Sequence, residues 1–169
     1  MSNKLNAVII DDMELARVSL RADLEDYCPN VKVVGEADGV LSGAKLLKGT
    51  TPDILFLDIE MEDGDGFDLL DIIPQGLDSV IFVTARQDFA LKAFQYSAVD
   101  YLLKPVDPAL LKKAVAKMAE KKKTNTAQLD ILKSSMQEGA KLERIALHTS
   151  DKIVVAELND IVRLEAMTN

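Results

Sequence analysis

The chain of 169 residues has one cysteine, one histidine, no tryptophan and no apolar run long enough to cross a bilayer. A single cysteine, Cys28, excludes an internal disulfide and is typical of a reducing compartment. The first residues lack the long apolar stretch of a secretory signal. We therefore expect a cytoplasmic protein that does not bind membranes. His148, the only histidine, lies in a strand-like tail and is interpreted as a surface residue.

Positive charge is also scarce, with 20 Lys and Arg against 28 Asp and Glu and a net charge of −8. A field of that sign repels nucleic acid, so we do not expect this chain to bind DNA well by itself. The acidity could equally serve solubility alone. The length suits one full domain with a smaller part attached, or two very small domains, and the hydrophobic share of 48% is enough for a core.

Apolar runs alternate with helical stretches through the first 119 residues. The predicted strands are residues 5–10, 31–35, 54–57, 80–83 and 99–103. Such runs need no polar alternation when a parallel sheet is covered by helices on both faces. We therefore predict an α/β fold, a doubly wound five-stranded parallel sheet, over residues 1–119. Its strand order, 2-1-3-4-5, is taken from known flavodoxin-like folds.

The composition changes from Glu120 onward. Residues 121–126 are polar, which favours a helix end or a linker, and a short amphipathic helix is predicted around Leu129 and Met136. We assign residues 120–140 to a helical linker. Strand-like runs then follow at residues 144–149, 153–155 and 161–164.

Polar side chains stand directly after four of the five predicted strands. They are Asp11, Asp12, Asp58, Thr84 and Lys104. Ligands bind outside the carboxyl ends of the strands in an open parallel sheet. Three carboxylates in one place repel each other unless a hard cation such as Mg²⁺ lies among them. The Lys104 ammonium and the Thr84 hydroxyl could then hold phosphoryl oxygens, which indicates phosphoryl transfer to a carboxylate.

Each of these residues alone also has a structural interpretation. Asp11 and Asp12 could cap a helix, Thr84 could be structural, and Lys104 could be a solvated lysine. Asp58 could cap the following turn. Their joint occurrence at four strand ends favours the functional interpretation.

The same segments resemble the receiver domain of two-component response regulators. Residues 8–12 resemble its first-strand acidic pair, and residues 57–61 with Gly66 resemble its phosphoacceptor loop. Residues 82–85 and 100–105 resemble its last two signatures. The resemblance covers residue 4 to about residue 119.

This resemblance implies a role for each site residue. Asp58 would be the phosphoacceptor, assisted by Thr84 and Lys104. Mg²⁺ would be bound by three carboxylates and one backbone carbonyl, those of Asp11, Asp12, Asp58 and Glu60. Thr84 and Tyr101 would form a switch pair, and the Lys104–Pro105 bond would be cis.

It also implies a partner and an output. The phosphoryl donor would be a sensor histidine kinase, and phosphorylation would promote a homodimer through the fourth helix, fifth strand and fifth helix. Residues 82–105 resemble receivers coupled to LytTR-type DNA-binding domains, and parts of the tail resemble the opening strands of that domain. We expect residues 141–169 to be its incomplete start, with DNA binding and transcriptional control only in a longer parent. The alternative is a short appended hairpin.

Other functions compete with this one. A phosphatase with an aspartate nucleophile would need a second aspartate at position 60, where Glu60 stands. A flavin-binding module of the same topology would need a hydroxyl-rich phosphate loop after the first strand, where Asp11 and Asp12 would repel a phosphate. A receiver-like interaction module independent of phosphorylation is the runner-up, and we expect no enzymatic turnover beyond gain and loss of the phosphoryl group. One departure is Glu62, where receivers commonly have proline. The acidic loop of residues 60–66 is interpreted as solvated.

Overall fold

The computed structural model describes residues 4–73, 77, 79–137, 144–148 and 153–157. The chain divides into two compact units, Met1–Lys123 and Thr124–Asn169. The first unit holds the sheet and all of the predicted site residues.

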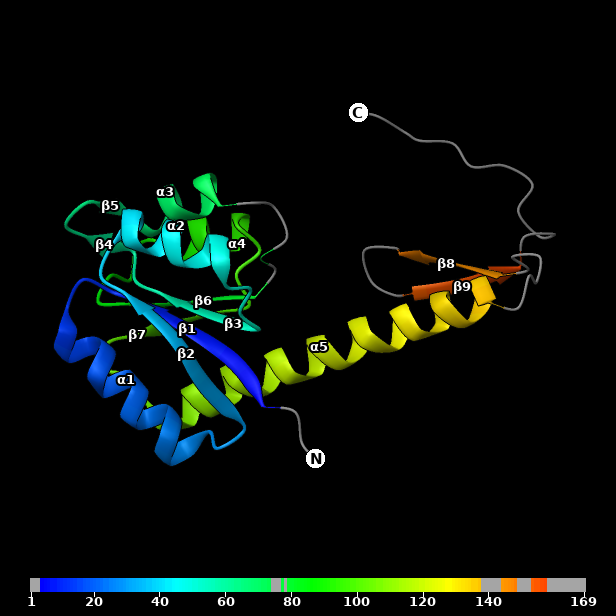
Figure 1. Ribbon diagram of the computed structural model, residues 1–169, viewed down its shortest axis with the longest axis horizontal. Helices are drawn as coiled ribbons and strands as arrows, with labels where there is room; N and C mark the ends of the chain where they lie inside the picture. Colours follow the sequence, from blue (N-terminus) through cyan, green and yellow to red (C-terminus); the bar gives the residue numbers. More distant parts are fainter. Residues whose placement is uncertain (1–3, 74–76, 78, 138–143, 149–152, 158–169) are drawn as a thin grey trace. The chain divides into compact units, whose positions relative to one another are not determined.

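The first unit is built on one parallel sheet in the order β2-β1-β3-β6-β7 (Figure 1). Its strands are β1 (Leu5–Ile10), β2 (Val31–Ala37), β3 (Ile54–Leu57), β6 (Val80–Thr84) and β7 (Asp100–Leu103). Every residue of β3 and β6 is buried, because helices cover both faces of the sheet. The five-stranded parallel sheet and its predicted strand order are confirmed.

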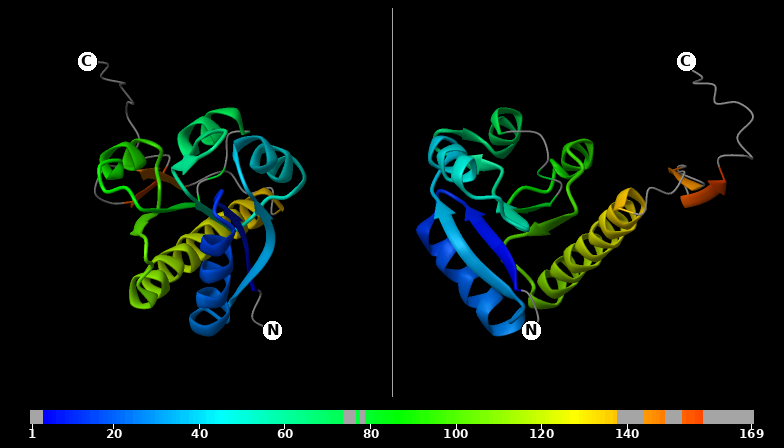
Figure 2. Two further views of the ribbon diagram at one scale, coloured as in Figure 1. Left: turned by 90° about the vertical axis from the view of Figure 1, so that its left-hand side faces the viewer. Right: turned by 45° about the vertical axis from the view of Figure 1, so that its right-hand side comes forward.

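Helices pack on the sheet in two layers (Figures 1 and 2). They are α1 (Glu14–Tyr27), α2 (Val40–Gly49), α3 (Gly66–Ile72), α4 (Ala90–Gln95) and α5 (Pro108–Gln137). Leu24 of α1 and Leu111 of α5 lie in one buried cluster. Leu47 of α2, Phe67 of α3 and Ala93 of α4 lie in the other, on the opposite face. The sheet therefore separates two cores, and the strand ends emerge between them.

The last helix is longer than the sequence pattern predicts. α5 runs without interruption for 30 residues, through the segment 121–126 where we expected a helix end or linker. No glycine or proline interrupts it after Pro108, and lysine, alanine and glutamine are good helix formers. Lys122 is also tied to the sheet, because its Nζ lies 2.6 Å from Asp53 Oδ1. No helix in the described ranges is long and apolar enough to cross a membrane.

The second unit contains an antiparallel pair of strands, β8 (Arg144–His148) and β9 (Ile153–Glu157). Both coincide with strand-like runs of the sequence. The third run, residues 161–164, lies outside the described residues.

Candidate functional site

Backbone hydrogen bonds place the predicted site residues just beyond the strand ends. The Asp11 N–H donates to Ala37 O (3.1 Å), and the Asp58 N–H donates to Ile10 O (2.9 Å). The Lys104 N–H donates to Thr84 O (2.9 Å) in the same way. The carboxyl ends of β1, β3 and β7 are thus each held by a neighbouring strand, so these side chains are gathered at one edge of the sheet.

Three carboxylates converge at this edge. One oxygen from each of Asp11, Asp12 and Asp58 lies within 4.8 Å of the others. Asp11 is 4% exposed and Asp58 6% exposed, whereas Asp12 is half-buried. Burial raises the pKa of the Asp11 carboxyl above its ordinary value, although hydrogen bonds from Lys104 and the Met13 N–H oppose the rise. The charge of Asp58 adds to it. These ligands are the hard oxygen donors that Mg²⁺ prefers.

Lys104 bridges two of the acids. Its Nζ lies 2.6 Å from Asp11 Oδ2 and 2.6 Å from Asp58 Oδ2. Burial alone would lower the pKa of the Lys104 ammonium, but the hydrogen bonds and charges of Asp11 and Asp58 outweigh it, and the pKa is raised. The ammonium therefore stays charged at neutral pH. The Lys104–Pro105 bond is cis, as predicted.

The expected switch residues meet at Arg86, which the sequence interpretation missed. Thr84 is 1% exposed, and its Oγ1 accepts a hydrogen bond from the Arg86 N–H (3.3 Å). The half-buried Tyr101 donates its hydroxyl to Arg86 O (2.7 Å), and its ring centroid lies 6.2 Å from that of Phe82. One residue thus contacts both members of the pair through its backbone.

The Arg86 guanidinium connects two loops around the site. Its Nη1 donates to Glu60 Oε1 (2.6 Å), and Nε and Nη2 hold both oxygens of Asp88. The hydrogen bonds that the guanidinium donates to these acids, that to Asp88 first, raise the pKa of Arg86 still further. The side chain of Glu60 therefore faces Arg86. Mg²⁺ binding by its backbone carbonyl stays a prediction.

The acidic loop is more ordered than a solvated loop requires. β4 (Glu60–Met61) and β5 (Gly64–Asp65) form a small antiparallel hairpin. Asp65 caps α3 in a reciprocal capping box with Asp68. The carboxylate of Asp63, though exposed, accepts the first N–H groups of α2. Asp38, a plausible local cap by its place just before α2, does not cap the helix and instead accepts from the Ser42 hydroxyl (2.7 Å).

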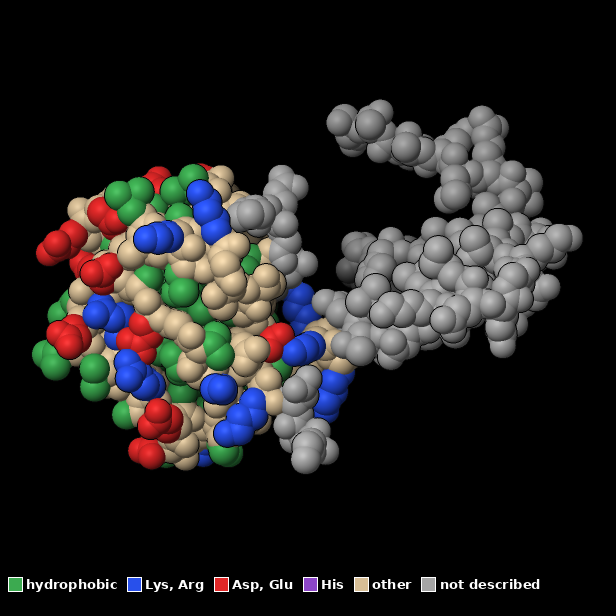
Figure 3. All heavy atoms as spheres, viewed as in Figure 1, with side chains coloured by type: hydrophobic (Ala, Val, Ile, Leu, Met, Phe, Trp, Pro, Cys, Tyr) green, Lys and Arg blue, Asp and Glu red, His purple; other side chains and the backbone are tan. Residues whose placement is uncertain are grey.

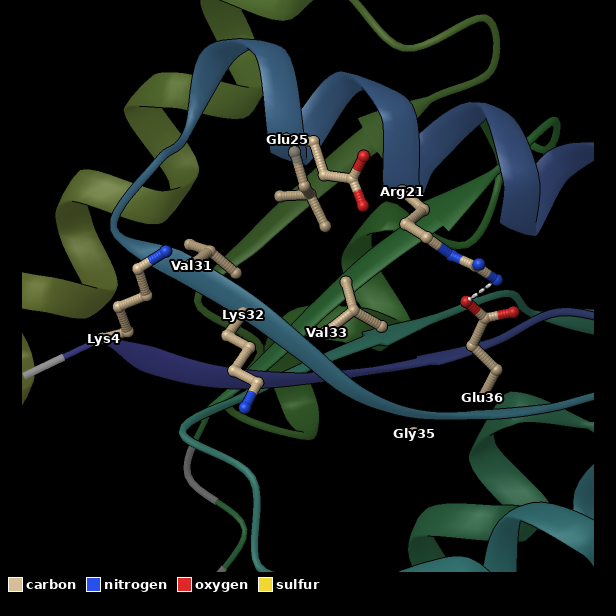
Figure 4. Close-up of a pocket in the computed structure, with 9 residues that line it drawn as sticks. Lys4, Arg21, Glu25, Val31, Lys32, Val33, Gly35 and Glu36 are labelled. Carbon is tan, nitrogen blue, oxygen red and sulfur yellow. Dashed lines mark ion pairs between the residues drawn. The ribbon is translucent and has the colours of Figure 1, made fainter.

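A separate hollow lies between α1 and the edge strand β2 (Figure 4). It has a volume of about 600 Å³, with Val31 and Val33 in its lining. Arg21 forms an ion pair across it with Glu36. Charged side chains of both signs are interspersed on the face of the first unit that Figure 3 shows. The described residues that line this hollow form no cluster of acids comparable to that of Asp11, Asp12 and Asp58.

Comparison with known families agrees with this geometry. A family model for the response regulator receiver domain matches residues 7–116. The chain belongs to the response regulator receiver family. In addition, a solved structure of the receiver domain of AraT, a response regulator from Geobacillus stearothermophilus, superposes with a TM-score of 0.63 at 30% identity. That likeness covers 72% of this chain and 98% of the other.

Curated relatives of this receiver include longer response regulators. Sensory transduction protein LytT from Bacillus anthracis is 32% identical over 160 residues, which cover 94% of this chain and 64% of LytT. Transcriptional regulatory protein BtsR from Escherichia coli K12 is 34% identical over 126 residues, 74% of this chain and 52% of BtsR. The chain spans between about half and two thirds of the length of the curated relatives it matches.

Proposed function

We propose that this receiver accepts a phosphoryl group on Asp58 from a sensor histidine kinase and thereby controls the output of a two-component response regulator. The observation that carries the proposal is the buried Asp58 carboxylate, held by Lys104 among three converging acids at the end of the sheet. Under this proposal, the only reactions of the receiver are the gain and the loss of that phosphoryl group.

The donor set fits Mg²⁺. Three carboxylates face one ammonium, so a divalent cation would offset the negative charge that Lys104 leaves uncompensated. Asp11, Asp12 and Asp58, with the backbone carbonyl of Glu60, would hold the ion. When bound, Mg²⁺ supplies positive charge to the phosphoryl oxygens.

The chain's own residues account for the transfer. A carboxylate oxygen of Asp58 attacks phosphorus, the new P–O bond forms as the P–N bond to the kinase histidine breaks, and the electron pair returns to that imidazole. The Lys104 ammonium then binds phosphoryl oxygen in place of the free carboxylate. The Thr84 hydroxyl, which now only accepts from Arg86, still has its own proton to donate to another phosphoryl oxygen.

The kinase would approach beside this cluster. A groove next to Asp11 and Lys104 is lined by the apolar side chains of Met13, Leu15 and Pro105 among others. Met13 is 59% and Leu15 79% exposed, so their burial by a partner helix is favourable. A donor docked in this groove would lie next to Lys104, which contacts Asp58 directly.

Phosphorylation is expected to be stoichiometric and to depend on Asp58. With acetyl phosphate and Mg²⁺, the intact mass of the native chain should rise by a single phosphoryl group, and omission of Mg²⁺ should abolish the rise. The Asp58→Asn variant should gain none, because an amide cannot serve as the nucleophile. No mass gain in either chain would instead leave a phosphorylation-independent interaction module.

We further propose that the phosphorylated receiver dimerises through α4, β7 and α5. On the parts of these elements whose side chains the structure describes, the exposed large apolar residues are Leu91, Phe94, Leu103 and Leu110. The half-buried Tyr101 lies on the same strand, β7, so a change at Thr84 and Tyr101 can reach this face.

A single polar substitution on that face should weaken the dimer. Phe94, 70% exposed, would be buried on both copies of the dimer. Burial of each side chain contributes on the order of 1.5 kcal/mol to the free energy of association, so Phe94→Ser should raise the dimer dissociation constant about a hundredfold. Sedimentation of the phosphorylated chain measures this. Leu41→Ser on α2, where Leu41 is 74% exposed, is the matched control and should leave the dimer unchanged. Equal effects of both substitutions would rule out this face.

The remaining part of the chain suggests the output. We propose domains at residues 1–119 and 141–169 joined by the linker 120–140, the second being the start of a LytTR-type DNA-binding domain. The match to LytT extends over 94% of this chain, well past the receiver, and BtsR is named a transcriptional regulatory protein.

A further inference from the structure

Asp63 connects the site loop to a helix far away in the sequence. It lies at the tip of the β4–β5 hairpin, and its Oδ1 accepts the N–H of Val40 (2.8 Å) while its Oδ2 accepts that of Leu41 (3.0 Å). These are the first two amides of α2, and the helix has no side-chain cap of its own at Gly39. A carboxylate at a helix N-terminus is favoured by the unpaired amides and by the helix dipole.

The position of Gly39 is matched to this contact. A Cβ added there would lie 2.4 Å from Asp63 Oδ1 and 2.7 Å from Oδ2. The Gly39 backbone is extended (φ −179°), so its conformation alone would admit any residue. The space taken by the Asp63 carboxylate is therefore what requires glycine. The two amides, that of Leu41 first, hold the pKa of Asp63 below its ordinary value.

The base of the same hairpin is attached to the site. Gly66, directly after β5, donates its N–H to Ile59 O (2.8 Å), and Ile59 in turn donates to Asp58 Oδ1 (2.6 Å). Glu60 begins the hairpin and pairs with Asp65 across it. The hairpin is thus fixed at its base beside Asp58 and at its tip on α2 (Figure 1).

We propose that Asp63 is a positioning residue for phosphoryl transfer, acting by holding the hairpin that carries the Glu60 carbonyl against α2. This inference rests on the proposed function. The strand that carries this carbonyl has only two residues, so the position of the carbonyl depends on the two attachments of the hairpin, its base beside Asp58 and its tip on α2. If the tip is released, Mg²⁺ binding itself must order the Glu60 carbonyl. This lowers the Mg²⁺ affinity more than it lowers the phosphorylation rate at saturating Mg²⁺.

The test compares two neighbouring acids. Glu62 is exposed and makes no hydrogen bond or ion pair with the described part of the chain, so Glu62→Ala removes the same charge as Asp63→Ala without the contact. Mg²⁺ affinity is measured by calorimetry, and the phosphorylation rate with acetyl phosphate by intact mass. Asp63→Ala should weaken Mg²⁺ binding about tenfold, whereas Glu62→Ala should stay within about twofold of the native chain. High Mg²⁺ should restore most of the rate.

Three further variants separate positioning from mere loss of stability. Gly39→Ala leaves Asp63 intact but displaces its carboxylate, so it should reproduce the effect of Asp63→Ala on Mg²⁺ affinity. The double variant should then be no worse than either single one, because both remove the same contact. Asp63→Asn keeps one acceptor oxygen and should fall between Asp63→Ala and the native chain.

The outcomes are distinct. Unchanged Mg²⁺ affinity in Asp63→Ala and Gly39→Ala overturns the inference, even if both variants melt at lower temperature, because that result describes a helix cap and nothing more. Additive losses in the double variant also contradict it. Failure of the proposed function itself appears in the native chain, as absence of both Mg²⁺ binding and phosphorylation, and not as a difference between variants.

Discussion

Replacing Lys104 with methionine is expected to lower the free energy of unfolding in Mg²⁺-free buffer by about 3 kcal/mol, the cost of leaving buried charge without its partner. The Lys104 ammonium contacts both Asp11 and Asp58, and these carboxylates are almost completely buried. Without the ammonium, the two carboxylates repel each other at a site that water barely reaches. Methionine retains the apolar length of the side chain, so the change isolates the charge.

Added Mg²⁺ should reverse most of this loss. A cation that binds only the folded chain stabilises it in proportion to the logarithm of its concentration over its dissociation constant, and removal of the competing ammonium tightens that binding. Urea unfolding with and without Mg²⁺ measures both effects. Lys113→Met, at an exposed position of α5, is the control and should leave both values unchanged. A Lys104→Met chain as stable as the native one without Mg²⁺ would contradict the electrostatic account.

The second large effect is expected at Gly66. A Cβ there would lie 2.4 Å from the backbone oxygen of Asp58 and 3.1 Å from Leu57 Cγ. Because the first of these atoms is backbone, the loop that carries Asp58 must move to admit a methyl group. Gly66→Ala should lower the free energy of unfolding by about 2 kcal/mol, as overpacking does. It should also slow phosphorylation about a hundredfold, because the reacting carboxylate is displaced.

A matched glycine provides the control for this change. Gly49 closes α2, and a Cβ added there meets no atom within 4 Å. Gly49→Ala should therefore change the free energy of unfolding by less than about 1 kcal/mol, the scale of helix propensity. Phosphorylation should keep its native rate. Chemical denaturation measures the free energy of unfolding, and the acetyl phosphate assay measures the phosphorylation rate. A Gly66→Ala variant that is phosphorylated at the native rate would show that the Asp58 loop tolerates displacement.

The sheet and the residues at its end were predictable because both depend on local sequence. Five apolar runs separated by helical stretches leave few topologies, and Asp11, Asp58 and Lys104 stand directly after strands. The carboxyl ends of parallel strands meet at one edge, so the cluster follows once the sheet is known. The strand order itself came from known folds.

Contacts between loops were not predictable in the same way. Asp63 lies more than 20 residues from the helix that it caps, and Asp38, closer in sequence, was the more plausible cap. Arg86 has no motif that announces its bonds to Glu60 and Asp88. The end of α5 was missed because polarity at residues 121–126 suggests a linker, although the same residues form helix well. Partners distant in sequence decide the cap of α2 and the bonds of Arg86, whereas local helix propensity extends α5.

The most direct test of the central claim is to locate the phosphoryl group on the native chain. Borohydride reduces an aspartyl phosphate to homoserine, and peptide mass spectrometry identifies the modified position after incubation with acetyl phosphate and Mg²⁺. We predict homoserine at position 58 alone, and none when Mg²⁺ is omitted. Homoserine at position 11 or 12 instead, or no modified peptide at all, would contradict the assignment of Asp58 as the phosphoacceptor.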